Sequence, residues 1–201
     1  EEMSGQKKFD AVDTANGTVT FTTDSCSPFV LARKAGVSVK GKVVSYNPNN
    51  ATTIQLMQGG EEKYSTTIAA TTGSGQKEQS FSFPAVAKGT YDLVVTKPGH
   101  LTYTVKGVVV GDTAIDLTKH SNAAIRTITL PAGDVNGDGT INSKDLNEIW
   151  RPANYLKSTT AAGVDPLADL NGDGTINSKD LNIVWLAENY LKSASQCEVI
   201  Y

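Results

Sequence analysis

Two stretches of the sequence, residues 134–145 and 169–180, carry oxygen-bearing side chains at matching positions. Asp or Asn stands at positions 1, 3, 5, 9 and 12 of each stretch, Gly at position 6 and Thr at position 7. Calcium takes about six to eight oxygen ligands, and this alternation can turn them towards one point, the Thr offering its backbone carbonyl. The pattern predicts two Ca2+ ions. The candidate ligands are Asp134, Asn136, Asp138, Thr140, Asn142, Asp145, Asp169, Asn171, Asp173, Thr175, Asn177 and Asp180.

Position 12 is the departure from a standard EF-hand loop, because Asp145 and Asp180 stand where Glu is usual. A shorter carboxylate can still bind through both oxygens if the loop closes further. A metal-free turn rich in Asp, Asn and Gly is the alternative for one such stretch, but two full matches favour calcium. Ile141 and Ile176, at position 8, are expected to pair across the two loops and to face the core.

The loops open a duplication: residues 134–158 and 169–193 are identical at 19 of 25 positions, at an offset of 35 residues. Apolar residues then recur with helical spacing. Pro152 should kink or end the first helix, and the second, with Ala187 at that place, should run straighter. The apolar face consists of Leu146, Ile149, Ala153 and Leu156 in the first copy and Leu181, Val184 and Leu191 in the second.

Neither loop has room for a full helix before it. Residues 130–133 contain a Pro and a Gly, and residues 163–168 allow one turn at most. These are loop–helix half-motifs. A sensor that changes the angle between entering and exiting helices is therefore disfavoured.

Residues 37–130 are rich in Val, Thr, Ile and Gly, with alternating apolar residues and frequent turn signals. Short strands at this spacing predict an antiparallel β-sandwich over residues 35–131. Residues 53–57 and 63–65 should form a hairpin around Gly59 and Gly60, and residues 71–79 an exposed loop. Further strands are expected at residues 37–44, 81–83, 90–95, 103–105 and 124–130.

Residues 9–32 also have β character, with strands expected at residues 17–23 and 29–32, and residues 1–34 are interpreted as the tail of a preceding module or as extra strands. Residues 1–10 lack a signal-peptide pattern, and residue 1 is expected to fall inside a longer natural chain. A net charge of −3 offers no general attraction to nucleic acid or an anionic membrane, and no apolar run would insert into a bilayer. Cys26 and Cys197 could pair, but two free thiols are favoured.

The duplicated pattern D-x-N-G-D-G-x-I-N-S-x-D-L closely resembles dockerins, calcium-dependent modules that bind cohesins in cellulosomes and related bacterial surface assemblies. The resemblance covers residues 132–201 as the domain and implies a multidomain chain, an all-β sandwich followed by a small all-α module. The sandwich, with Phe81-Ser-Phe83 and Lys97-Pro-Gly-His100, is similar to carboxypeptidase-regulatory-like (Cna-B-like) modules that often precede dockerins. The resemblance implies an extracellular, cell-surface localisation and, as partner, a cohesin module of a scaffoldin or of a cell-surface anchoring protein.

The resemblance also implies which residues face a cohesin. Because the two copies match, it implies two binding orientations related by a half-turn, biased by Arg151 against Leu186 and by Pro152. From the sequence alone, Trp150 and Trp185 could instead be core residues, since they adjoin the apolar face. The implied contact residues are Ser143, Lys144, Trp150, Arg151 and Tyr155, and in the second copy Ser178, Lys179, Trp185, Leu186 and Tyr190.

Catalysis is not expected within this chain, because the sequence shows no nucleophile elbow, HExxH, P-loop or paired Glu in a cleft-like context. Carbohydrate binding by the sandwich is the alternative function. It would need exposed aromatic platforms, for which Tyr46, Tyr64, Tyr91 and Tyr103 are the candidates. A spacer that packs on the calcium module and stiffens it is the preferred role.

Overall fold

The computed structural model describes residues 11–13, 18–20 and 36–201. Contacts divide the chain into two units, Glu1–Lys34 and Ala35–Tyr201. In the first unit β1 (Ala11–Asp13) pairs antiparallel with β2 (Thr18–Thr20). The expected strand at residues 29–32 and Cys26 lie outside the described residues, as does most of the interpreted tail.

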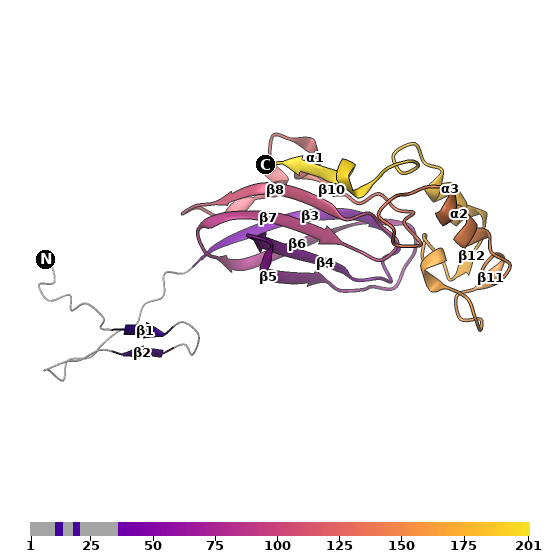
Figure 1. Ribbon diagram of the computed structural model, residues 1–201, viewed down its shortest axis with the longest axis horizontal. Coiled ribbons are helices and arrows are strands. Elements are labelled where there is room, and N and C mark those ends of the chain that lie inside the picture. Colours follow the sequence, from indigo (N-terminus) through magenta and orange to yellow (C-terminus); the bar gives the residue numbers. More distant parts are fainter. Residues whose placement is uncertain (1–10, 14–17, 21–35) are drawn as a thin grey trace, which may run out of the picture. The chain divides into compact units, whose positions relative to one another are not determined.

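The second unit begins with two sheets that face each other (Figure 1). One has the order β10-β3-β6, with β9 also paired to β3, and the other has the order β13-β8-β7-β4-β5. The strands are β3 (Val37–Tyr46), β4 (Thr52–Gln58), β5 (Glu61–Ile68), β6 (Gln76–Val86), β7 (Gly89–Thr96), β8 (Tyr103–Val110), β9 (Ile115–Asp116), β10 (Ile128–Thr129) and β13 (Glu198–Ile200).

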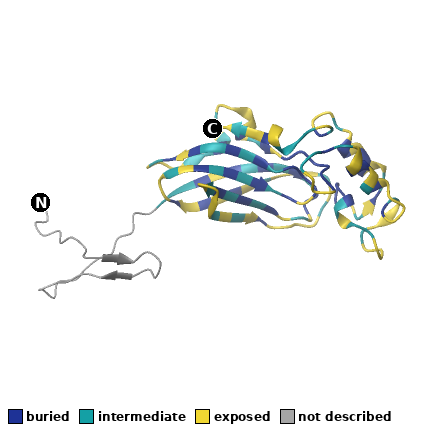
Figure 2. Cartoon of the chain, in the orientation of Figure 1, coloured by how far each residue is buried: buried dark blue, intermediate teal, exposed yellow. Residues whose placement is uncertain are grey.

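Alternation along the strands produces the core between the sheets. Ile54 and Leu56 of β4 and Leu93 of β7 are fully buried, whereas the intervening Thr53 and Gln55 are partly exposed. Figure 2 shows this as alternating colours along each strand. Successive side chains of a strand point to opposite faces, so a period of two buries one face against the opposite sheet. The predicted β-sandwich is confirmed.

The hairpin expected around Gly59 and Gly60 is confirmed. These two glycines join β4 to β5 with φ of 62° and 84°, the left-handed conformation that a tight hairpin turn needs. The expected loop at residues 71–79 is too long, because β6 already begins at Gln76.

The predicted strand at residues 124–130 is wrong. Residues Ala123–Arg126 form the short helix α1, and only β10 follows as strand. The Asn122 side chain accepts a hydrogen bond from the Ala124 amide at 3.0 Å, which caps the helix start. A local cap thus outweighs the preference of the β-branched residues for strand.

The calcium-loop region contains α2 (Ser143–Trp150) and α3 (Ser178–Val184), with β11 (Lys157–Ser158) paired to β12 (Thr175–Ile176). Short 3-10 helices occupy Leu117–Lys119, Pro166–Ala168 and Ala194–Cys197. Beyond α3 the chain returns to the sandwich, where β13 adds to β8 in parallel. The module is therefore joined to the sandwich at both of its ends. Cys197 is buried with a free thiol.

The helices are shorter than the sequence pattern indicated. Pro152 follows the end of α2, as expected, but α3 ends at the equivalent place without a proline, so the straighter second helix is wrong. In both copies a buried Asn ends the helix: Asn154 donates to the Glu148 carbonyl and Asn189 to the Ile183 carbonyl, each at 2.7 Å. These side chains satisfy carbonyls that a helix end leaves without partners.

Candidate functional site

Each candidate calcium loop is closed by the Asp at its twelfth position. Asp145 accepts hydrogen bonds from the Val135 amide at 2.9 Å and the Asn142 amide at 2.8 Å. Asp180 accepts from the Asn171 amide at 3.1 Å and the Asn177 amide at 2.8 Å. Both aspartates are fully buried, so each draws the start of its loop onto the start of its helix.

The first Asp of each loop is also buried. Burial raises the pKa of Asp134 and of Asp169, and burial raises the pKa of Asp180 to about 6. One oxygen of Asp134, Oδ1, is buried without any hydrogen-bond partner. A desolvated carboxylate oxygen without a partner is costly, and a cation beside it removes that cost.

The remaining ligand candidates suit a hard cation. Each loop combines three carboxylates with two Asn side chains and a Thr carbonyl, the oxygen set that calcium prefers. Among the described residues no three His, Cys, Asp or Glu side chains gather into a ready cluster. One carboxylate of each loop pairs with a lysine: Lys144 Nζ lies 3.1 Å from Asp138 Oδ2, and Lys179 Nζ lies 2.9 Å from Asp173 Oδ2. Those hydrogen bonds lower the pKa of both aspartates.

The two copies are joined crosswise rather than loop to loop. Ile141 and Ile176 are fully buried, as expected. However, the Ile141 amide donates to the Lys192 carbonyl at 2.8 Å, and the Leu156 amide donates to the Ile176 carbonyl at 2.8 Å. The expected pairing of the two isoleucine positions with each other is therefore wrong at the backbone. Each loop pairs with the segment that follows the other copy's helix.

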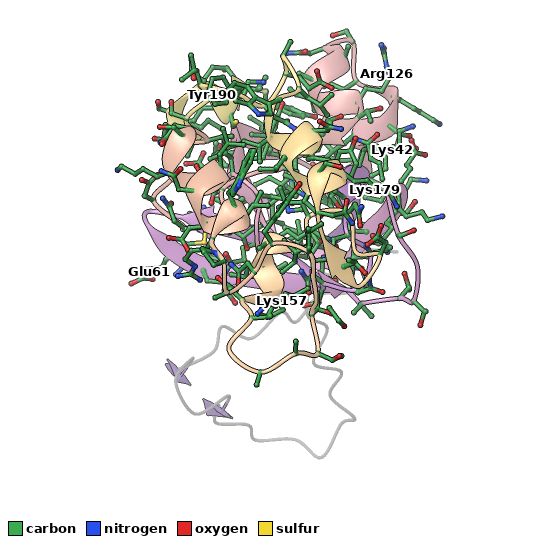
Figure 3. All side chains as sticks on the ribbon, turned by 90° about the vertical axis from the view of Figure 1, so that its right-hand side faces the viewer. Lys42, Glu61, Arg126, Lys157, Lys179 and Tyr190 are labelled. Carbon is green, nitrogen blue, oxygen red and sulfur yellow. The ribbon has the colours of Figure 1, made fainter. Side chains whose placement is uncertain are left out.

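Two aromatic pairs lie at the C-terminal ends of α2 and α3. Trp150 is 62% exposed and Trp185 is 55% exposed, so the alternative of core tryptophans is wrong. Trp150 stacks on Tyr155 with ring centroids 5.5 Å apart, and Trp185 lies against Tyr190 at 4.4 Å. Figure 3 views this end of the molecule, with Tyr190 and Lys179 at its surface.

Leu156 and Leu191 belong to the same surface and were misassigned to the core face. They are 72% and 68% exposed, each with a φ of 60°. Because the helices end at Trp150 and Val184, the helical period no longer applies to them, and Ala153 is exposed for the same reason. In the sequence, the only sign of their exposure is that each Leu directly follows a repeated Tyr, Tyr155 or Tyr190. We call Trp150, Tyr155 and Leu156 the first apolar patch, and Trp185, Tyr190 and Leu191 the second.

The other candidate contact residues surround these patches. Ser143, Lys144, Ser178 and Lys179 are exposed in the first turns of the two helices. Arg151 is exposed and pairs with Glu148 at 3.1 Å, whereas its counterpart Leu186 is half-buried. The two surfaces thus share their residue types except at this position.

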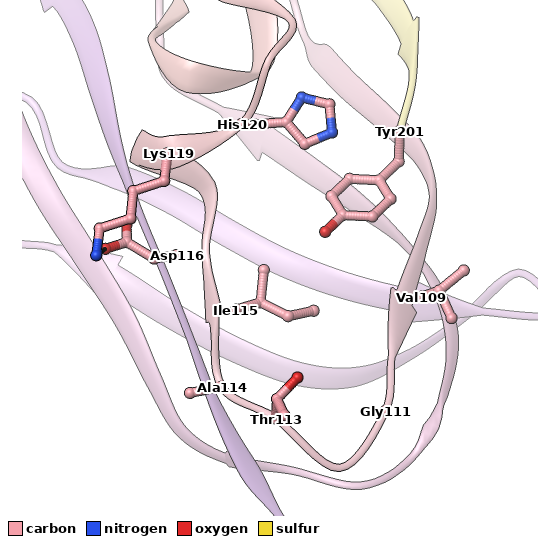
Figure 4. A pocket seen from close by; sticks show the side chains of 9 residues that line it. All are labelled: Val109, Gly111, Thr113, Ala114, Ile115, Asp116, Lys119, His120 and Tyr201. Carbon is pink, nitrogen blue, oxygen red and sulfur yellow. Dashed lines mark ion pairs between the residues drawn. The ribbon is translucent and has the colours of Figure 1, made fainter.

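The candidate aromatic platforms of the sandwich are not exposed. Tyr91 and Tyr103 are buried, and Tyr46 and Tyr64 pack against the core. A cavity of about 310 Å³ lies beside the 3-10 helix at residues 117–119, where Tyr201 approaches His120 with ring centroids 4.9 Å apart (Figure 4). Its charged residues, Lys119 and Asp116, lie 3.9 Å apart. No described helix is long and apolar enough to span a bilayer.

Comparison with known proteins agrees with the division into a β-sandwich and a calcium-loop module. Residues 132–186 match the family model described as dockerin type I domain, so the resemblance to dockerins is confirmed. No curated protein matches the sequence. Two solved structures are similar: an N-terminal and a C-terminal interface mutant of a type II cohesin–X-dockerin complex from Acetivibrio cellulolyticus. They share 27% and 26% identity, with TM-scores of 0.58 and 0.57.

Both similarities extend over 80% of this chain and 99% of the matched chain. They therefore include the sandwich as well as the calcium-loop module. A β-sandwich that precedes a dockerin fits an X module, and the expected order of a sandwich followed by a dockerin is confirmed.

Proposed function

We propose that this chain is a calcium-dependent adaptor whose dockerin binds a cohesin and so anchors a parent protein in a cellulosome-like extracellular complex. The dockerin match and the similarity to cohesin–X-dockerin complexes support the adaptor role. The observation that carries the proposal is the pair of apolar patches, which repeat the same three residue types at the ends of two equivalent helices, with exposed Trp and Leu side chains and a half-buried Tyr. Exposed Trp and Tyr with a nearby Arg are typical anchors of protein interfaces.

Calcium would be held by the twelve loop residues given above and would fix the geometry of both helices. Three carboxylates in each loop repel one another until a cation neutralises them. The helices are short, and the buried Asp134 oxygen without a partner adds to the cost of the metal-free fold. Metal binding and folding of the module should therefore be coupled.

The near-identity of the patches supports two binding orientations. After a half-turn, Trp185, Tyr190 and Leu191 would take the places of Trp150, Tyr155 and Leu156. Lys144 and Lys179, which pair with Asp138 and Asp173 in the same way, would also exchange. The two surfaces differ where Arg151 of the first copy corresponds to Leu186 of the second, and this difference would favour one orientation over the other.

The sandwich would act as a spacer that stiffens the dockerin. Its hydrogen bonds to the dockerin include one from the Gly133 amide to the Gly99 carbonyl at 2.8 Å. The β13–β8 pairing adds a second connection. Carbohydrate binding is less well supported, because the four candidate tyrosines of the sandwich are buried or packed on its core.

Calorimetry of the chain against type I and type II cohesins, in calcium and in EDTA, tests the proposal. We expect one-to-one binding in calcium and none in EDTA. Trp150→Ala or Trp185→Ala alone should lower the affinity by no more than about tenfold, because the other orientation still binds, whereas both together should lower it by about a hundredfold or more.

Val109→Ala is the matched control, since Val109 is 60% exposed but lies on the sandwich. It should leave the affinity unchanged. A single tryptophan substitution that abolishes binding would contradict the two orientations while leaving the adaptor role in place. Calcium-independent binding, or no binding to either cohesin type, would contradict the function itself.

A further inference from the structure

The described part of the sandwich donates hydrogen bonds to one calcium loop and none to the other. The Asn47 side-chain amide donates to the Asp169 carbonyl at 2.7 Å, and the Asn49 amide donates to the Gly172 carbonyl at 2.8 Å. The backbone amide of Gly75 donates to the Asn171 carbonyl at 2.7 Å. Three donors from two loops of the sandwich therefore hold the first four residues of the second calcium loop. These loops lie at the end of the sandwich next to the dockerin (Figure 1).

The first calcium loop has no equivalent support. Within residues 36–201, no hydrogen bond given by the structure joins the sandwich to the loop of residues 134–145. Asn136 and Gly137 are exposed, whereas the corresponding Asn171 and Gly172 are buried. Two loops of nearly identical sequence thus stand in different surroundings.

Two equivalent glycines mark the difference at atomic scale. Gly137 and Gly172 have nearly the same backbone, with φ of 72° and 74°. A Cβ atom on Gly137 would meet nothing within 4 Å, whereas one on Gly172 would lie 2.6 Å from Asn47 Oδ1 and 2.7 Å from Asn49 Nδ2. The second loop is therefore in close contact with both asparagines.

Contacts within the sandwich hold Asn47 in the conformation that makes this contact. It is buried, with a left-handed φ of 52°, and its Oδ1 accepts a hydrogen bond from the backbone amide of Asn49 at 3.2 Å. The side-chain amide of Asn49 also donates to the Gly73 carbonyl at 2.9 Å, which connects the turn at residues 46–50 to the sandwich loop that contains Gly73. The donors that hold the second calcium loop are thus fixed by contacts within the sandwich.

A loop that is already ordered binds a metal more tightly than one that must first be ordered. Fixing the backbone of a loop costs conformational entropy, and the contacts above meet part of that cost before calcium binds. The coupling is reciprocal, because a ligand that prefers the ordered loop also stabilises whatever orders it.

We propose that Asn47 and Asn49 are positioning residues that make the second loop the tighter calcium site and link its occupation to the order of the sandwich turn at residues 46–50. The inference rests on the proposed binding of calcium by both loops. The two sites would then differ in calcium affinity although their candidate ligand residues are of the same types. As calcium falls, the first loop should empty before the second.

Calcium titration of the full chain by calorimetry, after removal of bound metal, tests this inference. We expect two phases whose affinities differ by about tenfold or more. Asp173→Ala removes a candidate ligand of the second loop and should abolish the tighter phase, whereas Asp138→Ala should abolish the weaker one. Gly172→Ala should weaken the tighter phase by about tenfold, and Gly137→Ala, with the same backbone conformation, should change either phase by less than about threefold.

A second measurement reports on the sandwich itself. Amide hydrogen exchange at residues 46–50 should slow when calcium is added to the wild-type chain or to Gly137→Ala, and should respond less in Gly172→Ala. The pair Asn47→Gly and Asn49→Ala should act like Gly172→Ala, since Gly accepts the left-handed φ of Asn47.

The outcomes separate this inference from the proposed function. Two equal calcium sites, or a tighter site that is lost with Asp138→Ala, would overturn the inference while leaving the adaptor role intact. Equal effects of Gly172→Ala and Gly137→Ala would overturn it as well. An absence of calcium binding in the wild-type chain would overturn both.

Discussion

The side-chain amide of Asn154 donates a hydrogen bond to the backbone carbonyl of Glu148 at 2.7 Å and ends α2 there. Its Oδ1 accepts from the Asp165 amide at 2.9 Å, so one buried side chain both ends the helix and fixes the connection to the second copy. Asn189 repeats the first contact in α3. Directly after each Asn come a half-buried Tyr, which lies against the exposed Trp, and an exposed Leu.

Replacing either Asn should therefore destabilise the dockerin. Asn154→Ala leaves a helix-end carbonyl and the Asp165 amide without partners, and we expect a loss of about 1–3 kcal/mol in the free energy of unfolding. Urea unfolding in saturating calcium measures it. Asn147→Ala, an exposed position of the same helix, should change stability by less than about 0.5 kcal/mol. Equal effects of the two substitutions would contradict the role of Asn154.

Leu156 and Leu191 should matter for binding and not for folding. Both have the left-handed φ of 60° that Gly adopts freely, and both are largely exposed. The double variant Leu156→Gly, Leu191→Gly should keep its stability to within about 1 kcal/mol and weaken cohesin binding by about tenfold or more. Calorimetry and urea unfolding of the same samples separate the two effects. A large stability loss with unchanged affinity would show that the leucines are structural.

Removal of calcium should be visible in the tryptophan fluorescence. The chain has two Trp residues, Trp150 and Trp185, so this signal reports on the dockerin alone. EDTA should change the emission and reduce the helical circular dichroism if metal binding and folding are coupled as proposed. Calcium should restore both, whereas magnesium at the same concentration should not, since it requires a stricter octahedral geometry. Spectra identical in EDTA and calcium would contradict the structural role of the metal.

His100 should make the stability depend on pH. Burial lowers the pKa of its imidazole from 6.5 to about 4, and its Nε2 accepts a hydrogen bond from the Tyr46 amide at 3.1 Å. The unfolded chain therefore binds a proton between these pH values and the folded chain does not, so stability falls as pH falls through this window. Relative to His100→Gln, the free energy of unfolding of the wild type should fall by about 2 kcal/mol between pH 7 and pH 5.

Urea unfolding at the two pH values in saturating calcium provides this comparison, because the carboxylates of the calcium loops titrate alike in both proteins. A wild type that gains stability relative to His100→Gln at pH 5 would contradict the sign of the expected effect.

Local patterns in the sequence were sufficient for much of the fold. Ile54, Leu56 and Leu93 follow the strand period and are buried where it places them, and Gly59 and Gly60 mark their hairpin correctly. The predictions failed where a short-range hydrogen bond ended a pattern. Asn122 starts α1 within a stretch that reads as strand, and Asn189 ends α3 although no proline follows it.

By itself, the sequence determined the duplication and predicted calcium chemistry, because the spacing of candidate ligands within a twelve-residue loop is a local property that the chain carries wherever the loop lies. Only the tertiary structure decided which of the repeated residues are exposed and how the two copies differ. Trp150 and Leu156 reach the surface because the helix stops between them. The second calcium loop differs from the first because Asn47, distant in the sequence, lies against it. Contacts between distant segments depend on how the modules pack, and no pattern within either repeat contains that information.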